Sequence, residues 1–225
     1  MKRIYVPTQS VDDWKKHLAA PDKHWRSGCS AKELAECWER ANGFPPGFNA
    51  LFAGSDHEGL KKMELLLAIP EYQVGLPGRG HSSQNDLFVL TRTKDGELAV
   101  MMVEGKVSET FGEILLDWLV DASDGKEKRL QNLLEILTLP SKVPSCIRYQ
   151  LLHRAASAMI EAKRFNARYA MMIIHSFSPE HRWLEDYQAF LGLYEKNGKE
   201  NDLVRLFSRD GIDFFAGWVA DQKQA

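Results

Sequence analysis

The chain has 225 residues, with 29 Lys and Arg against 31 Asp and Glu, and a formal net charge of −2. Hydrophobic residues make up 44% of it and charged residues 27%, which is typical of a folded globular protein and excludes a disordered, collagen-like or coiled-coil chain. The near-neutral charge argues against a large non-specific nucleic-acid surface but leaves room for a local basic groove. No apolar run approaches the roughly 20 residues that span a bilayer, so we expect no membrane association.

The first residues and the cysteines indicate a cytoplasmic protein. Met1 to Pro7 starts with basic residues but lacks the apolar segment of a secretion signal. The three cysteines, Cys29, Cys37 and Cys146, are an odd number at spacings that match no zinc template. We therefore expect reduced thiols.

Residues 1–57 read as short helical pieces. Ser10 is a candidate cap for a short helix, and Ser30 to Glu33 has the pattern of a capping box that opens a longer one. That helix is expected to stop at Asn42-Gly43, before two prolines. We predict a helical N-terminal segment, 1–57, packed on an α/β core, 58–225, or else one single domain, 1–225.

The middle of the chain contains strand signals. The run Met63 to Ile69 fits a strand or the end of a helix. The apolar runs Leu87 to Thr91 and Leu98 to Val103 are separated by a segment that contains Asp95-Gly96, which predicts a β-hairpin.

The second half alternates helices with strands. Helical spacing extends over a leucine-rich segment around 130–137, over 147–164 and over 181–196, whereas 169–174 and 212–219 fit buried strands. This alternation predicts an α/β fold in which helices flank a central mixed sheet.

One group of polar residues on the predicted hairpin has the residue types of a catalytic site. Glu104 and Lys106 are two residues apart, so their side chains project from the same face of a strand. A three-residue loop with a left-handed Gly96 pairs Thr93 with Glu97 and sets Asp86 opposite Glu104. A two-residue Asp95-Gly96 turn instead moves Asp86 to the other face, unless a bulge corrects the register.

In the first register the hairpin could bind a metal ion. Two neighbouring carboxylates repel each other, and a hard divalent cation such as Mg²⁺ relieves the repulsion while keeping positions for water and a phosphate oxygen. Lys106 could orient that water, and the carbonyl of Gly105 could be a further ligand. Such a set suits hydrolysis of a phosphodiester. The plain alternative is a surface ion pair between Glu104 and Lys106, with Asp86 ending a loop.

Asp86 followed by Glu104-Gly105-Lys106 across a hairpin resembles the core motif of the PD-(D/E)XK, or restriction-endonuclease-like, nuclease superfamily. The resemblance covers about residues 58 to 178 and points to a bacterial branch. It implies a restriction-endonuclease-like core, Asp86 and Glu104 as metal ligands, and Lys106 as the catalytic lysine. Gln150, at the start of the helix after the motif, resembles a glutamine that some branches carry there.

The resemblance also has gaps. Many members add an acidic ligand from a preceding helix, for which Glu58 and Glu64 are the candidates, and Asn85 stands where the family's namesake motif has proline.

Three functions stay open at this stage. The first is a nuclease that uses Mg²⁺ or Mn²⁺ to hydrolyse nucleic acid, as a monomer, as a homodimer or with a protein partner. The second is a catalytically inactive nuclease-like protein for binding or assembly. The third is a small-molecule enzyme that uses the loop from Gly75 to Gln84. His175, after the strand at 169–174, is expected to be a structural histidine.

Overall fold

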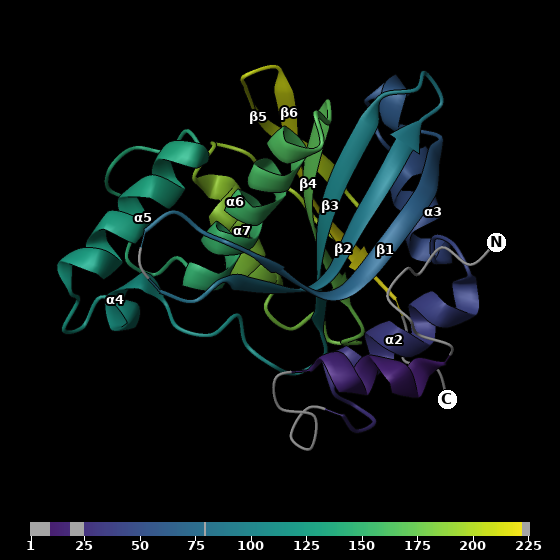
Figure 1. Ribbon diagram of the computed structural model, residues 1–225, viewed down its shortest axis with the longest axis horizontal. Coiled ribbons are helices and arrows are strands. Elements are labelled where there is room, and N and C mark those ends of the chain that lie inside the picture. Colours follow the sequence, from purple (N-terminus) through teal and green to yellow (C-terminus); the bar gives the residue numbers. More distant parts are fainter. Residues whose placement is uncertain (1–9, 19–24, 79, 222–225) are drawn as a thin grey trace.

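The computed structural model describes residues 10–18, 25–78 and 80–221. The first residues of the chain, on which the expectation about secretion depends, lie outside them. The central element is a six-stranded mixed sheet with the strand order β1-β2-β3-β4-β6-β5 (Figure 1). In chain order the strands are β1 (Met63–Val74), β2 (Ser83–Thr93), β3 (Leu98–Lys106), β4 (Tyr169–Ser176), β5 (Leu203–Arg209) and β6 (Ile212–Ala220).

The sheet combines antiparallel edges with a parallel centre. β1, β2 and β3 form an antiparallel meander, β3 and β6 both run parallel to β4, and β5 closes the other edge antiparallel to β6. All eight residues of β4 are buried, as expected for a central parallel strand that is covered on both faces.

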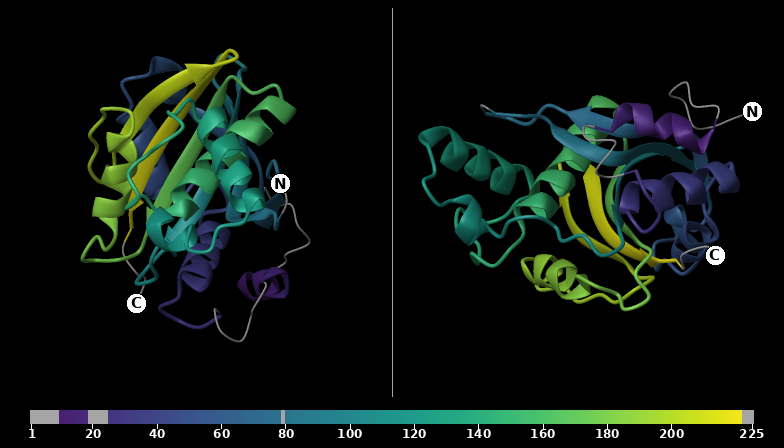
Figure 2. Two further views of the ribbon diagram at one scale, coloured as in Figure 1. Left: turned by 90° about the vertical axis from the view of Figure 1, so that its left-hand side faces the viewer. Right: turned by 90° about the horizontal axis from the view of Figure 1, so that it is seen from below.

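Helices cover both faces of the sheet (Figures 1 and 2). One face carries the C-terminal helices, and the long α6 packs across β3 and β4. The other face carries the N-terminal helical segment, whose buried residues share one apolar cluster with the sheet. The helices are η1 (Val11–His17), α2 (Ser30–Ala41), α3 (Pro46–Ala53), η2 (Glu58–Leu60), α4 (Leu115–Trp118), α5 (Asp124–Ile136), α6 (Tyr149–Arg164) and α7 (Leu184–Gly192).

The predicted α/β class, with a central mixed sheet between helices and a helical N-terminal segment, is confirmed. The prediction omitted α3, α4 and β5. It also placed Ser30 as a helix cap, whereas Ser30 is the first residue of α2 and its N–H donates to Glu109. Glu33 instead accepts from the N–H of Gly28. The helix does end at Asn42, which has a left-handed φ of 44°.

The β2–β3 hairpin takes the three-residue loop. Gly96 is left-handed, with a φ of 90°, and its N–H donates to the carbonyl of Thr93. The N–H of Thr93 in turn donates to the carbonyl of Glu97 over 2.8 Å. The register continues to Leu87 opposite Val103 at the far end. The loop therefore sets the next pair along the hairpin, Asp86 and Glu104, level with each other.

Across the part of the chain that the structure describes, no helix has both the length and the apolar character needed to cross a membrane.

Candidate functional site

Asp86 and Glu104 meet on the sheet face covered by α6. Their neighbours two residues away, Phe88 and Met102, lie in the apolar cluster of that face, and strand alternation sends the two carboxylates the same way. Asp86 Oδ2 also accepts a hydrogen bond of 2.8 Å from the N–H of Gly105. The two strands thus hold the carboxylates in fixed relative positions.

Glu104 is at the centre of a buried ion-pair network. One of its oxygens accepts from Lys106 Nζ at 2.6 Å, and the other accepts from Arg154 Nε at 2.5 Å. Arg154 Nη2 also lies 4.0 Å from Asp86 Oδ1. Gln150, one helical turn before Arg154 on α6, accepts from Lys106 Nζ at 3.3 Å. Four of these side chains were expected at one site, and the structure brings Asp86, Glu104, Lys106 and Gln150 together.

The network is almost closed to solvent. The side chains of Glu104 and Lys106 are 3% and 4% exposed, whereas that of Asp86 is 20% exposed. The ammonium group of Lys106 also lies 4.8 Å from the ring centre of Phe111, a cation–π contact. Asp86 is therefore the carboxylate nearest to water.

The two carboxylates of the hairpin have opposite pKa shifts. Burial and the charge of Glu104 raise the pKa of Asp86 to about 7. Burial also acts to raise the pKa of Glu104, but the charges of Arg154 and Lys106 outweigh it and bring that pKa to about 2. Glu104 is thus ionised at neutral pH. Asp86 has too little positive charge nearby to be fully ionised there.

Sequence reasoning missed a third carboxylate, Glu71. It lies on β1 between Pro70, which pairs with Leu87, and Tyr72, which pairs with Asn85, and so it is level with Asp86. Burial and the charge of Asp86 raise the pKa of Glu71 to about 8. Its backbone is left-handed, with a φ of 53°, a conformation that is uncommon outside glycine and occurs at functional sites.

Neighbouring amide side chains hold this edge of the sheet in place. Gln84 donates to Glu71 Oε2 over 2.6 Å. The fully buried Asn85 donates to the carbonyls of Tyr72 and Ser83. Asn85, which stands where the resemblance has proline, therefore fixes the backbone beside both Glu71 and Asp86.

The structure does not bring Glu58 or Glu64 to this site. Glu64 pairs with Arg92 near the hairpin loop, at the other end of β2 from Asp86, and the two side chains form an exposed ion pair of 2.7 Å. Glu58 is exposed on η2, where it pairs with Lys61. Glu71 takes the place expected for them, because β1 runs beside β2 along its whole length. The Gly105 carbonyl stays a predicted ligand.

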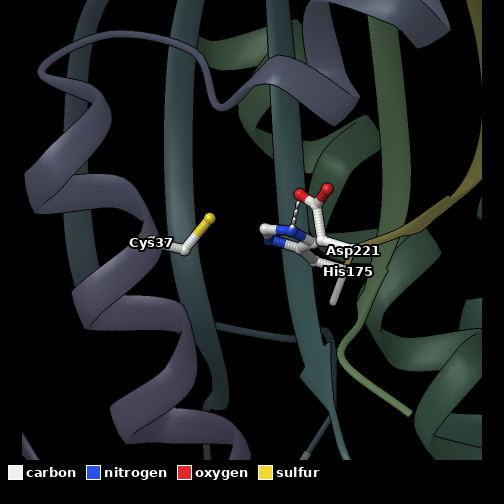
Figure 3. A group of neighbouring side chains, drawn as sticks. All are labelled: Cys37, His175 and Asp221. Atoms are coloured by element: carbon white, nitrogen blue, oxygen red, sulfur yellow. Dashed lines mark hydrogen bonds and ion pairs between the residues drawn. The ribbon is translucent and has the colours of Figure 1, made fainter. Parts of the chain in front are cut away.

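A second group with ligand-type side chains lies on the opposite face of the sheet (Figure 3). Among the described residues, Cys37, His175 and Asp221 form the one group of three such side chains with ligand atoms within 4.8 Å of one another. The indole N–H of Trp38 donates to His175 Nδ1 at 3.3 Å, so the ring proton is on Nε2 and donates to Asp221 at 2.9 Å.

This arrangement does not favour a metal ion. Both ring nitrogens of His175 are engaged by hydrogen bonds to Trp38 and Asp221, so neither is open to an ion. Burial and Asp221 raise the pKa of Cys37 to about 12, which keeps the sulfur as a thiol rather than the thiolate that binds metals. The group instead ties α2 to the ends of β4 and β6, a structural role for His175.

Fold and site together define an α/β protein with a buried acidic and basic network at the end of β3. The chain belongs to a family described as a domain of unknown function, DUF6946, whose model matches residues 7–223. Neither the curated proteins nor the solved structures contain a match to the chain.

Replacing the charged centre of the network tests its weight in stability. We expect Glu104→Gln to lower the free energy of unfolding at pH 7 by about 3–5 kcal/mol, because Lys106 and Arg154 are left buried without a carboxylate. Chemical denaturation checks this. Glu64→Gln, which breaks an exposed pair, is the control and should cost less than about 1 kcal/mol. Equal small losses in both variants would contradict a buried network.

The raised pKa of Asp86 predicts that this residue destabilises the folded protein as the pH rises. Between the unfolded value of 3.8 and the folded value of about 7, the folded state holds a proton that the unfolded state has lost, so Asp86 reduces stability as pH rises. Asp86→Asn should therefore raise the melting temperature in EDTA, and more at pH 8 than at pH 5.

Asp95→Asn, in the exposed hairpin loop, is the matched control and should show no such trend. A gain from Asp86→Asn that is equal at both pH values would refute the predicted titration.

Proposed function

We propose that this protein is a metal-dependent nuclease that hydrolyses phosphodiesters of nucleic acid. The observation that carries the proposal is the placement of Asp86 opposite Glu104, with Lys106 bound to the same glutamate. This is the geometry that the nuclease motif requires. The chain order also agrees with the resemblance to the PD-(D/E)XK superfamily, since the hairpin is followed by the helices α4, α5 and α6 and then by β4 parallel to β3.

The charge of the site favours a hard divalent cation. Glu71, Asp86 and Glu104 carry three negative charges when ionised, against two positive charges on Lys106 and Arg154. Burial and repulsion between the carboxylates raise the pKa values of Asp86 and Glu71, and a cation would relieve that repulsion. Carboxylate oxygens are the ligands that Mg²⁺ and Mn²⁺ prefer. Asp86 and Glu104 would hold the ion, which would supply Lewis-acid activation of a water and of the phosphate.

The remaining side chains have positioning roles in this proposal. Gln150 accepts from Lys106 and holds its ammonium group beside Glu104, where it can orient the attacking water. Arg154 fixes the carboxylate plane of Glu104 and adds positive charge for the phosphate oxygens. Glu71 stands next to Asp86 and adds a further carboxyl group at this edge.

Metal titration tests the proposal. Isothermal titration should show binding of Mn²⁺ to the wild type and an affinity at least about 10-fold weaker for Asp86→Ala. Glu64→Ala is the control, because it removes an exposed carboxylate at the other end of the strand pair, and it should bind as the wild type does. Lys106→Ala should keep the metal but cleave a labelled oligonucleotide about 10²-fold to 10⁴-fold more slowly.

If the wild type does not bind Mn²⁺, or if Asp86→Ala binds it as tightly as the wild type does, the proposed nuclease function is refuted. Cleavage by Lys106→Ala at the wild-type rate would contradict the role of the lysine.

One observation favours a second candidate, a catalytically inactive nuclease-like binding or assembly protein. The guanidinium of Arg154 already contacts Glu104 and lies 4.0 Å from Asp86, so it occupies the neighbourhood that a cation would share. Both oxygens of Glu104 are engaged by side chains of the protein itself. In this alternative the arginine replaces the metal permanently.

Arg154→Gln separates the two candidates. If the arginine replaces a metal, the wild type should not bind Mn²⁺ and Arg154→Gln should gain binding. If the protein is a nuclease, the wild type binds Mn²⁺ and Arg154→Gln loses cleavage instead, because Glu104 and the phosphate lose a positive partner. The same titration and the same oligonucleotide assay decide the question.

A further inference from the structure

A cavity of about 280 Å³ lies beside the network, between the segment that joins β1 to β2 and the helices α4, α5 and α6. This volume is near the lower end of the range of ligand pockets, about 300–1,000 Å³, and so suits one small ligand. Its lining includes the side chains of Ser83, Trp118, Lys126, Arg129, Tyr149 and His153. We call it the aromatic-basic cavity.

The lining of the aromatic-basic cavity combines flat rings with positive charge. The rings of Trp118 and Tyr149 are stacked, with centroids 3.9 Å apart, and Lys126 lies 5.1 Å from the Trp118 ring centre. Lys126 and Arg129 line the cavity, while the lining contains no Asp or Glu. Burial and the charge of Arg154 keep the pKa of His153 well below its usual range, so its imidazole is neutral.

The cavity is connected to the proposed catalytic centre through two of its wall residues. Ser83 Oγ lies 2.9 Å from His153 Nδ1 and accepts from Arg154 Nη1 at 3.0 Å. Arg154 in turn contacts Glu104. Tyr149 also directly precedes Gln150 on α6. Two residues, Ser83 and Arg154, therefore separate the cavity from the carboxylate of Glu104.

We propose that the aromatic-basic cavity binds one unpaired nucleotide of the strand, next to the phosphodiester that is cleaved. This inference rests on the proposed nuclease function. A base is a flat ring that fits against the edges of the stacked Trp118 and Tyr149 rings. Its phosphate complements Lys126 and Arg129, which donate to the carbonyls of Trp118 and His81. A base inside a cavity has left the helical stack, at a cost that is smallest in a single strand. The substrate class is thus single-stranded or locally unpaired nucleic acid.

Two substitutions on α5 provide a matched test. Lys126→Gln removes a cation from the cavity wall, whereas Lys128→Gln removes the same charge from an exposed position two residues away. With Mg²⁺ and a labelled 12-nucleotide strand, Lys126→Gln should raise KM by about 10-fold and leave kcat near the wild-type value. Lys128→Gln should leave both constants unchanged. Wild type should cleave the single strand in preference to the same sequence as a duplex.

A binding measurement in EDTA separates the cavity from the catalytic chemistry. Adenosine 5′-monophosphate, used as the probe, should bind the wild type and Asp86→Ala equally and bind Lys126→Gln more weakly. The unlabelled single strand should compete with it. Binding of the probe without any cleavage by the wild type would support the cavity as a nucleotide site while refuting the nuclease.

Two results would overturn the inference while leaving the nuclease standing. The first is cleavage by the wild type with no binding of the probe and with Lys126→Gln identical to Lys128→Gln. The second is probe binding with which the strand does not compete, because the cavity would then take a free nucleotide instead of part of the substrate.

Discussion

The carboxylate of Glu104, held between Lys106 and Arg154, is the interaction on which the site depends. It joins the end of β3 to helix α6 in a region where the side chains are almost fully buried. A buried charge without a partner is strongly unfavourable, so Lys106 and Arg154 both require the carboxylate of Glu104. The network therefore fixes how α6 lies on the sheet, and with it the positions of Gln150 and of the cavity beside Tyr149.

At the edge of the same network, carboxyl groups outnumber the positively charged side chains. Asp86 and Glu71 lie side by side across β1 and β2, and burial together with the charge of the neighbouring carboxylates raises the pKa values of both. A surplus of carboxylate beside a lysine is the electrostatic setting in which a divalent ion binds. Asp86, the most exposed of the hairpin groups, faces the water from which an ion and a phosphate would arrive.

Much of this arrangement could be predicted from the sequence, because local turn chemistry sets it. The sequence left two hairpin registers open, and the one with the loop Lys94-Asp95-Gly96, which the structure has, places Asp86 opposite Glu104. Glu71 could not be found, since its position depends on a register shift between Leu65 and Leu67 on β1. The spacing of Gln150 and Arg154, four residues apart on one helix face, was a usable signal for the arginine. Asp210-Gly211, between β5 and β6, was a hairpin signal of the same kind, and overlooking it left β5 out.

The most direct measurement is the anomalous scattering of manganese in crystals of the wild-type protein soaked in Mn²⁺. We predict one strong peak about 2.1 Å from carboxylate oxygens of both Asp86 and Glu104. No peak between these two residues, or a peak only at Cys37, His175 and Asp221 on the opposite face, would contradict the proposed metal site.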